Sequence, residues 1–333
     1  MALWCIKGGR TGEREQRMVE HSVVAVGWET LGDLSTCSDK EELMIKYQEA
    51  FPDAARRRTA HHVGQLYSFV KRIKIDDLVV VPLKTQSAIA IGEIKSDYLF
   101  SEEYGQDMRH IRKVEWIRTD LPRTAFDQDL LYSFGAFMTV CQITRNDAER
   151  RVRALLRGEQ IQPVDEEEID DQSADVEQIA RDQLLKHISQ KYRGHELARL
   201  VEAVLSAQGM TVERMNPGPD GGVDILAGSG AMGFDSPCIC VQVKSADTPV
   251  GVDVFRALKG TMDSFNADQG LLVSLGGFKI STLSEALNSF FRVRLWDSGD
   301  LINAIIRYYD KLPDTIQAEI PLKRVWALAF EED

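Results

Sequence analysis

One carboxylate, one amide and one ammonium group stand close together in the second half of the chain. Asp224 closes the sequence Asp-Gly-Gly-Val-Asp that starts at Asp220, and Gln242 follows eighteen residues later. Lys244 comes two residues after Gln242. Because side chains alternate along a strand, Gln242 and Lys244 face the same way. If the two segments form neighbouring strands, the three side chains converge on one point.

This combination of groups is suited to phosphodiester hydrolysis. That reaction needs a cation that polarises the phosphate and lowers the pKa of an attacking water. Mg²⁺ accepts carboxylate and carbonyl oxygens together with waters. Asp224 would supply the anionic ligand, Gln242 its side-chain oxygen and Val243 its backbone oxygen. Lys244 would orient the water or stabilise charge on the phosphate.

Helices and strands alternate around these residues. A helix through Leu197 to Leu205, stopped by Gly209, opens the series. Strands are expected near 211–215, 223–227, 239–244, 270–274 and 293–296, and further helices at 252–265, 280–290 and 299–309. The alternation predicts an α/β domain in which a mixed sheet carries helices on both faces.

Residues 192–312 resemble the Mrr-type restriction endonuclease domain of the PD-(D/E)xK nuclease superfamily. The resemblance rests on 220–224, Gln242-x-Lys244, 270–274 and Phe278. It implies Mg²⁺-dependent cleavage of double-stranded DNA, often by a dimer and often in defence against foreign or modified DNA. It also implies that Asp224, Gln242 and Lys244 are the catalytic residues, with Gln242 in place of the superfamily acid.

The chain departs from this family at one position. Many relatives carry a glutamate in the first helix that faces the metal, and that position is Ala198 here. Glu202 lies one turn further on and shares the same helix face, so it is the candidate carboxylate, whereas Glu196 would point elsewhere. With few anions besides Asp224 and Asp220, we expect weak metal affinity.

The N-terminal half has a different pattern. Strands are expected at 23–26, 78–82, 88–94 and 111–117, and helices at 40–51 and 61–73. This predicts a β-rich domain, a small barrel with helical insertions. It weakly resembles the PUA-like and EVE-like domains, which often bind modified bases in nucleic acids.

Aromatic residues near the strand ends could form a base pocket in this half. A flipped base can stack between aromatic rings, which is worth about 1–3 kcal/mol per base. Trp28 and Tyr98 are the preferred candidates for a modified base or another ligand. The alternative is that both rings belong to the hydrophobic core.

Charge and composition suggest how the chain is divided. Nine of the 52 acidic residues lie at 159–178, which hold no basic residue, and the rest of the chain is near neutral. Like charges repel, so this segment is expected to be a solvated linker between domains at 1–158 and 179–333. No apolar run is long enough for a membrane span, and no basic leader precedes an apolar block. The five cysteines fit free thiols in the cytoplasm.

Three functions remain open at this stage. The leading hypothesis is a modification-dependent restriction endonuclease, with Mg²⁺ as cofactor and double-stranded DNA, modified or not, as partner. A homodimer or higher oligomer is expected, because a double-strand break requires two cuts. The alternatives are a DNA-binding sensor with an inactive nuclease domain, and a nuclease switched on by a small messenger bound in the N-terminal half.

Overall fold

The chain folds into two compact units, called here the N-terminal unit and the C-terminal unit. The computed structural model describes residues 1–159, 176–215 and 222–325. The units comprise chiefly Met1–Thr119 with Asp127–Ile179, and Asp120–Phe126 with Ala180–Glu331. Most of the expected linker at 159–178, and Asp220 with Gly221, lie outside the described residues.

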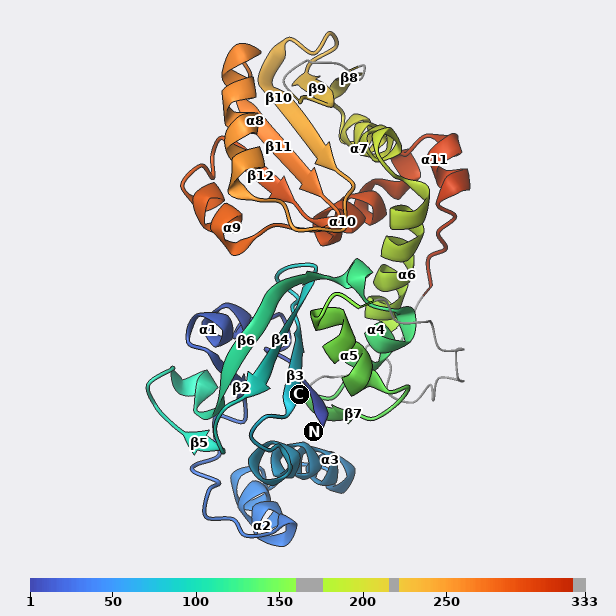
Figure 1. The fold of residues 1–333 in the computed structure, drawn as a ribbon. Coiled ribbons are helices and arrows are strands. Elements are labelled where there is room, and N and C mark those ends of the chain that lie inside the picture. Colours follow the sequence, from blue (N-terminus) through green and yellow to red (C-terminus); the bar gives the residue numbers. More distant parts are fainter. Residues whose placement is uncertain (160–175, 216–221, 326–333) are drawn as a thin grey trace. The chain divides into compact units, whose positions relative to one another are not determined.

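A mixed five-stranded sheet forms the centre of the C-terminal unit (Figure 1), in the order β12-β11-β10-β9-β8. The strands are β8 (Thr211–Arg214), β9 (Ile225–Ser229), β10 (Asp235–Lys244), β11 (Gln269–Ser274) and β12 (Val293–Trp296). β8, β9 and β10 pair antiparallel, whereas β10, β11 and β12 pair parallel. The predicted mixed sheet is therefore confirmed, and β10 joins its two halves.

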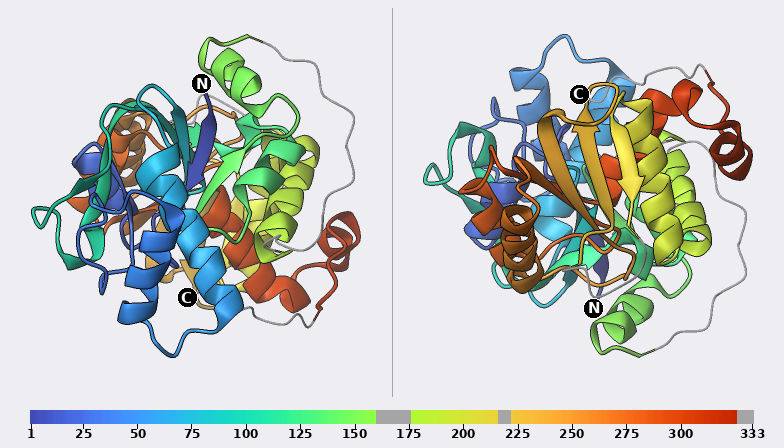
Figure 2. Two further views of the ribbon diagram at one scale, coloured as in Figure 1. Left: turned by 90° about the horizontal axis from the view of Figure 1, so that it is seen from below. Right: turned by 90° about the horizontal axis from the view of Figure 1, so that it is seen from above.

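Helices cover both faces of this sheet (Figure 2). The helical elements of this unit are α6 (Val176–Lys191), α7 (His195–Ala207), α8 (Val252–Ser264), α9 (Ile280–Leu287), α10 (Ser298–Tyr308) and α11 (Asp314–Glu319), with the 3₁₀ turns η3 (Arg123–Ala125) and η5 (Tyr309–Lys311). Val241 and Val243 of β10 belong to the core formed with α7 and α10, and Cys240 to the core formed with α8. Because strand side chains alternate, Gln242 lies on the α8 face.

Helix α7 forms where apolar residues recur at helical spacing. Leu197, Leu200, Val201 and Val204 are buried along one side of it. Gly209 follows the helix with φ 95°, a left-handed conformation that glycine adopts without strain. The predicted helix and its glycine stop are confirmed.

The N-terminal unit contains one curled sheet, in the order β2-β6-β4-β3-β1-β7 with β5 beside β6 (Figure 1). Its strands are β1 (Leu3–Ile6), β2 (Val23–Val26), β3 (Leu78–Pro82), β4 (Ala88–Ile94), β5 (Leu99–Phe100), β6 (His110–Pro122, which runs into the other unit) and β7 (Val140–Ile143). Its helical elements are α1 (Glu15–Glu20), α2 (Lys40–Ala50), α3 (Arg56–Tyr67), the π turn η1 (Ser68–Arg72), η2 (Gln106–Met108), α4 (Gln128–Phe134) and α5 (Ala148–Leu156). The predicted β-rich character is confirmed, and the likeness to PUA-like and EVE-like domains stays a prediction.

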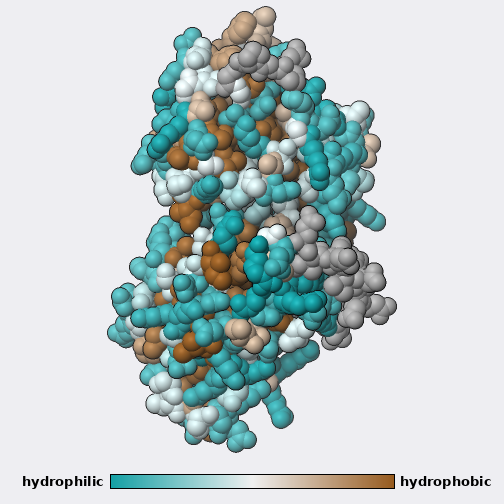
Figure 3. All heavy atoms as spheres, in the orientation of Figure 1, coloured by the Kyte–Doolittle hydropathy of each residue, from teal (hydrophilic) through white to brown (hydrophobic). Residues whose placement is uncertain are grey.

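Polar side chains cover most of the face shown in Figure 3, with apolar side chains scattered between them. Exposed apolar side chains of the C-terminal unit include Leu287, Phe290 and Phe291 at the end of α9. Within the described ranges, no helix is both long enough and apolar enough to cross a membrane.

Candidate active site

Asp224 is held against the neighbouring strand β10. Its backbone N–H donates to the carbonyl of Val241 at 2.8 Å, and its Oδ2 accepts from the N–H of Val243 at 2.7 Å. The register of β9 and β10 ends at Ile225, opposite Val241, so Asp224 directly precedes the paired strand and is bonded on both sides of Gln242. The structure therefore brings two of the three predicted catalytic residues together.

The turn before Asp224 lies directly on the Gln242 side chain. Gly222 has φ 85°, and a Cβ atom added there would lie 2.7 Å from Nε2 of Gln242. Glycine is thus required at this position both by its backbone conformation and by the close approach of the amide. Gln242 is 7% exposed, and its Oε1 has no hydrogen-bond partner among the described residues.

Lys244 completes the predicted set. It lies two residues after Gln242 on β10 and therefore on the same face of the sheet. Burial raises the pKa of Asp224, while the Val243 N–H, the Lys244 ammonium and positive charge on His195 each lower it in part. Lys244 and His195 are thus near enough to act on the Asp224 carboxylate electrostatically.

His195 is a residue of this site that the sequence analysis misses. It is the first residue of α7 and is exposed. The preceding residue, Gly194, donates its N–H to Oγ of Ser245 at 2.9 Å, which ties the start of α7 to the end of β10 beside Lys244. The sequence offers only a histidine after a glycine at a helix start, a signal too common to identify it.

The carboxylate proposed from α7 is not brought to this group. Ala198 is buried, and the carboxylate of Glu202 lies 3.5 Å from the guanidinium of Arg214. Arg214 pairs with Ile225, whose side chain lies in the core on the α7 face of the sheet. Glu202 therefore sits on the face opposite Gln242, and the expectation that it reaches the metal is wrong. Helical spacing predicts which residues share a side of α7, but not which face of the sheet that side meets.

The remaining oxygens form a small donor set for a hard cation. It consists of the Asp224 carboxylate, Oε1 of Gln242 and the backbone carbonyl of Val243. A buried amide oxygen without a partner is the kind of group that a cation satisfies. The described residues contain no cluster of three or more His, Cys, Asp or Glu side chains able to hold a metal. The set fits Mg²⁺ with one carboxylate, with waters or substrate oxygens completing its shell.

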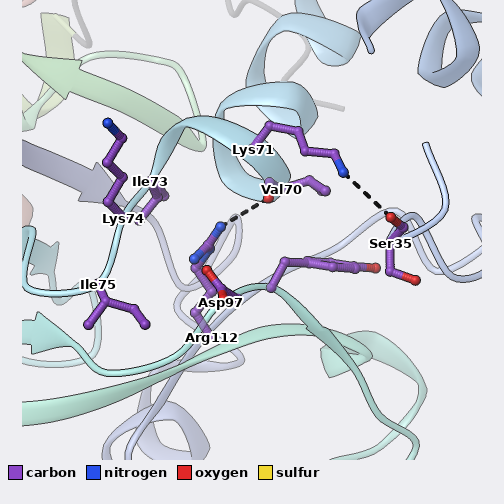
Figure 4. Close-up of a pocket in the computed structure, with 9 residues that line it drawn as sticks. Ser35, Val70, Lys71, Ile73, Lys74, Ile75, Asp97 and Arg112 are labelled. Carbon is purple, nitrogen blue, oxygen red and sulfur yellow. Dashed lines mark hydrogen bonds between the residues drawn. The ribbon is translucent and has the colours of Figure 1, made fainter. Parts of the chain in front are cut away.

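The N-terminal unit has a pocket of about 570 Å³ that Tyr98 helps to line (Figure 4). The ring of Tyr98 is mostly buried, and its hydroxyl accepts from the N–H of Leu34 at 3.2 Å and hydrogen-bonds to His110 at 2.8 Å. Trp28 does not line the pocket, and its Nε1 donates to His62 at 3.2 Å. Both rings belong to the hydrophobic core of this unit, Tyr98 as a buried member and Trp28 packed against it, and of the two only Tyr98 also lines the pocket.

Cationic side chains dominate the polar lining of this pocket. Arg112 is buried, and burial lowers its pKa to about 10. Its guanidinium donates to the carbonyls of Phe69, Val70 and Ser96 at 2.7, 3.0 and 3.0 Å, which caps the π turn η1. Lys71 and Lys74 add two positive charges and Asp97 one negative charge. The pocket is therefore suited to an electron-rich or anionic group.

Two family models match the chain. Residues 189–305 match the Mrr catalytic model, described as a restriction endonuclease, and residues 4–140 match a domain of unknown function (DUF8426). The first match spans Asp224, Gln242 and Lys244, and it confirms the resemblance that the motifs of this half predict.

Solved structures with a looser likeness include two restriction enzymes. The DNA modification-dependent restriction endonuclease AspBHI is 15% identical with a TM-score of 0.35, over 81% of this chain and 74% of that one. The MspJI restriction endonuclease in complex with a 27-mer oligonucleotide is 13% identical with a TM-score of 0.34, over 95% of this chain and 71% of that one. No curated protein matches the chain.

Proposed function

We propose that this DNA endonuclease, which carries an Mrr-type restriction domain at residues 189–305, cuts with Mg²⁺ at a site formed by Asp224, Gln242 and Lys244. The observation that supports it best is the Asp224 carboxylate fixed at 2.7 Å to the N–H of Val243, the residue after Gln242, whose buried Oε1 has no partner among the described residues. A buried carboxylate next to an unsatisfied oxygen destabilises the fold unless a cation joins them.

Each residue has a separate task in this proposal. Asp224, Gln242 and the Val243 carbonyl would hold the ion. When bound, such an ion supplies an activated water and neutralises charge on the phosphate. Lys244 orients the attacking water or stabilises charge on the phosphate, and His195 lies nearby at the start of α7.

The N-terminal unit is proposed to recognise the DNA feature that licenses cutting. Its pocket combines the Tyr98 ring with the cations Lys71 and Arg112, and a volume of about 570 Å³ has room for a base. A base turned out of the duplex could stack there and hydrogen-bond at its edge. The protein would then be a modification-dependent restriction enzyme, with a recognition domain at 1–158, a linker at 159–178 and a nuclease domain at 179–333.

The assembly follows from the reaction. Each site of this type makes one cut, so a break in both strands of a DNA duplex needs two copies, and we propose a homodimer or higher homo-oligomer. A restriction enzyme meets foreign DNA in the cytoplasm, where we place this one.

The test is cleavage of phage DNA that carries modified bases, compared with the same DNA without them, each with and without Mg²⁺. We expect cutting that requires Mg²⁺, prefers modified DNA and is lost in Lys244→Ala. Equal cutting by Lys244→Ala, or no cutting of any substrate, would reject the proposed site.

A DNA-binding sensor with an inactive nuclease domain is the second candidate. It is favoured by the neutral Gln242 and by the position of Glu202 against Arg214, which leave Asp224 with little anionic support. Unchanged DNA affinity in Asp224→Ala, together with no cutting by the wild type, would identify it. Cutting that starts only after a nucleotide messenger is added would identify a messenger-activated nuclease instead.

A further inference from the structure

Ser274 has a buried hydroxyl without a hydrogen-bond partner among the described residues. It ends β11 and is 0% exposed, and its Oγ is unpaired. Two other buried hydroxyls of the same unit donate to backbone carbonyls, Thr261 to Ala257 at 3.0 Å and Thr282 to Val250 at 2.9 Å. Because an unpaired buried hydroxyl destabilises a fold, the partner of Ser274 should be a group that arrives or moves.

The strand register places Ser274 beside the proposed active site. β10 and β11 pair parallel, with Gln242 opposite Leu272 and Lys244 opposite Ser274. Opposed residues of a parallel pair point to the same face, so Ser274 shares the face of Gln242 and Lys244. Leu272, two residues earlier, packs in the core under α8, which confirms that orientation.

The backbone fixes this relation. The N–H of Leu275 donates to the carbonyl of Lys244 at 3.1 Å, so the ends of β10 and β11 are tied together just beyond the two side chains. The ammonium group of Lys244 forms no salt bridge within 4.0 Å to a residue of the described part of the chain. An ammonium group has three donor hydrogens and a hydroxyl oxygen can accept one of them.

We infer that Ser274 is a positioning residue of the nuclease site, whose Oγ accepts a hydrogen bond from Nζ of Lys244 and directs the ammonium group when DNA is bound. A lysine side chain is long and flexible, so an ammonium group in position for the phosphate gains from a fixed acceptor. The inference rests on the proposed function, because it acts through Lys244.

The test compares Ser274→Ala and Ser274→Thr with the wild type in Mg²⁺-dependent DNA cleavage. Ser274→Ala removes the hydroxyl and leaves only a small gap, so we expect no loss of thermal stability. We expect its kcat to fall about 10- to 100-fold, the range that one hydrogen bond to a charged group supports, with KM unchanged. Ser274→Thr, which restores the hydroxyl, should recover most of kcat.

Ser284→Ala is the matched control, because Ser284 is an exposed residue of α9 whose Oγ donates to the carbonyl of Ile280 at 3.0 Å. It should cut like the wild type. Wild-type kcat in Ser274→Ala overturns the inference, and so does a loss of rate matched by a loss of thermal stability or by a higher KM.

The proposed function can fail separately from this inference. If the wild type cuts and Lys244→Ala does not, while Ser274→Ala cuts at the wild-type rate, only the role of Ser274 is lost. If the wild type cuts no DNA, or Lys244→Ala cuts as fast as the wild type, the proposed function fails and the role of Ser274 fails with it.

Discussion

Replacing Gly222 with alanine tests whether the glycine turn exists to hold the Gln242 side chain in place. A Cβ atom there would lie 2.7 Å from Nε2 of Gln242, and real Cβ atoms essentially never approach closer than 3.0 Å. Either the turn or the amide must therefore move. Because Gln242 is 7% exposed, its amide has little free space, and a displacement would carry Oε1 away from its observed position.

The size of the effect can be separated into two parts with a matched control. Gly209 has φ 95°, similar to the 85° of Gly222, but no heavy atom lies within 4 Å of the Cβ position. Backbone strain alone should lower the free energy of unfolding by about 1–2 kcal/mol in both Gly222→Ala and Gly209→Ala. Only Gly222→Ala should also slow cleavage, by about 10- to 100-fold, if Oε1 of Gln242 belongs to the site.

Urea denaturation measures the first quantity, and single-turnover cleavage of a DNA substrate in Mg²⁺ measures the second. If Gly222→Ala cuts as fast as Gly209→Ala, the amide of Gln242 does not need its observed position, and the residue leaves the proposed metal site. If both variants lose the same large fraction of activity, the effect comes from strain and not from the amide.

Three further predictions follow from buried charge and from the pocket. Asp182→Asn should lower the free energy of unfolding by about 3–5 kcal/mol in urea denaturation, because buried Arg123 loses its counter-charge and one of two bonds, of 2.6 and 2.7 Å, to the carboxylate. Arg123→Met combined with Asp182→Leu should recover most of this loss. Asp224→Asn should abolish cleavage yet raise the free energy of unfolding at neutral pH. Burial raises the pKa of Asp224, so its ionised form opposes folding, and asparagine removes that charge. In thermal melts across pH, the gain in stability should disappear below the ordinary pKa of 3.8, where the carboxyl group is protonated in both states. Lys71→Gln should weaken binding of modified DNA in a fluorescence titration, whereas Lys46→Gln, outside the pocket, should not.

The strands of the nuclease domain could be predicted because their signals are local. The apolar run before Ser274 and the alternation around Gln242 and Lys244 need no knowledge of distant residues. Gln242 and Lys244 lie on one strand, so their shared face follows from the strand period alone. The contact of Asp224 with β10 follows once β9 and β10 are known to be neighbours, because Asp224 directly precedes β9.

What could not be predicted depends on contacts far apart in the sequence. Strand β1 has four buried residues at Leu3–Ile6, and it pairs with β3 and β7, more than 70 residues away, without an alternating pattern to reveal it. Helical spacing puts Glu202 on the same helix side as Ala198, but only the contact with Arg214 on β8 shows which sheet face that side meets. His195 reaches the site because Ser245 fixes the start of α7.

The charge balance of the proposed site predicts weak affinity for a metal ion and metal binding that is strengthened by bound DNA. Among the described residues, Asp224 is the one carboxylate at the site, and the Lys244 ammonium acts on it as a counter-charge. The family resemblance puts the neutral amide of Gln242 where the superfamily has an acid, so the proposed site, free of DNA, would attract a divalent cation only modestly. The phosphate of bound DNA would supply the missing negative charge and further oxygen ligands. Metal binding and substrate binding would then reinforce each other, and the nuclease would gain its ion mainly where DNA is already held.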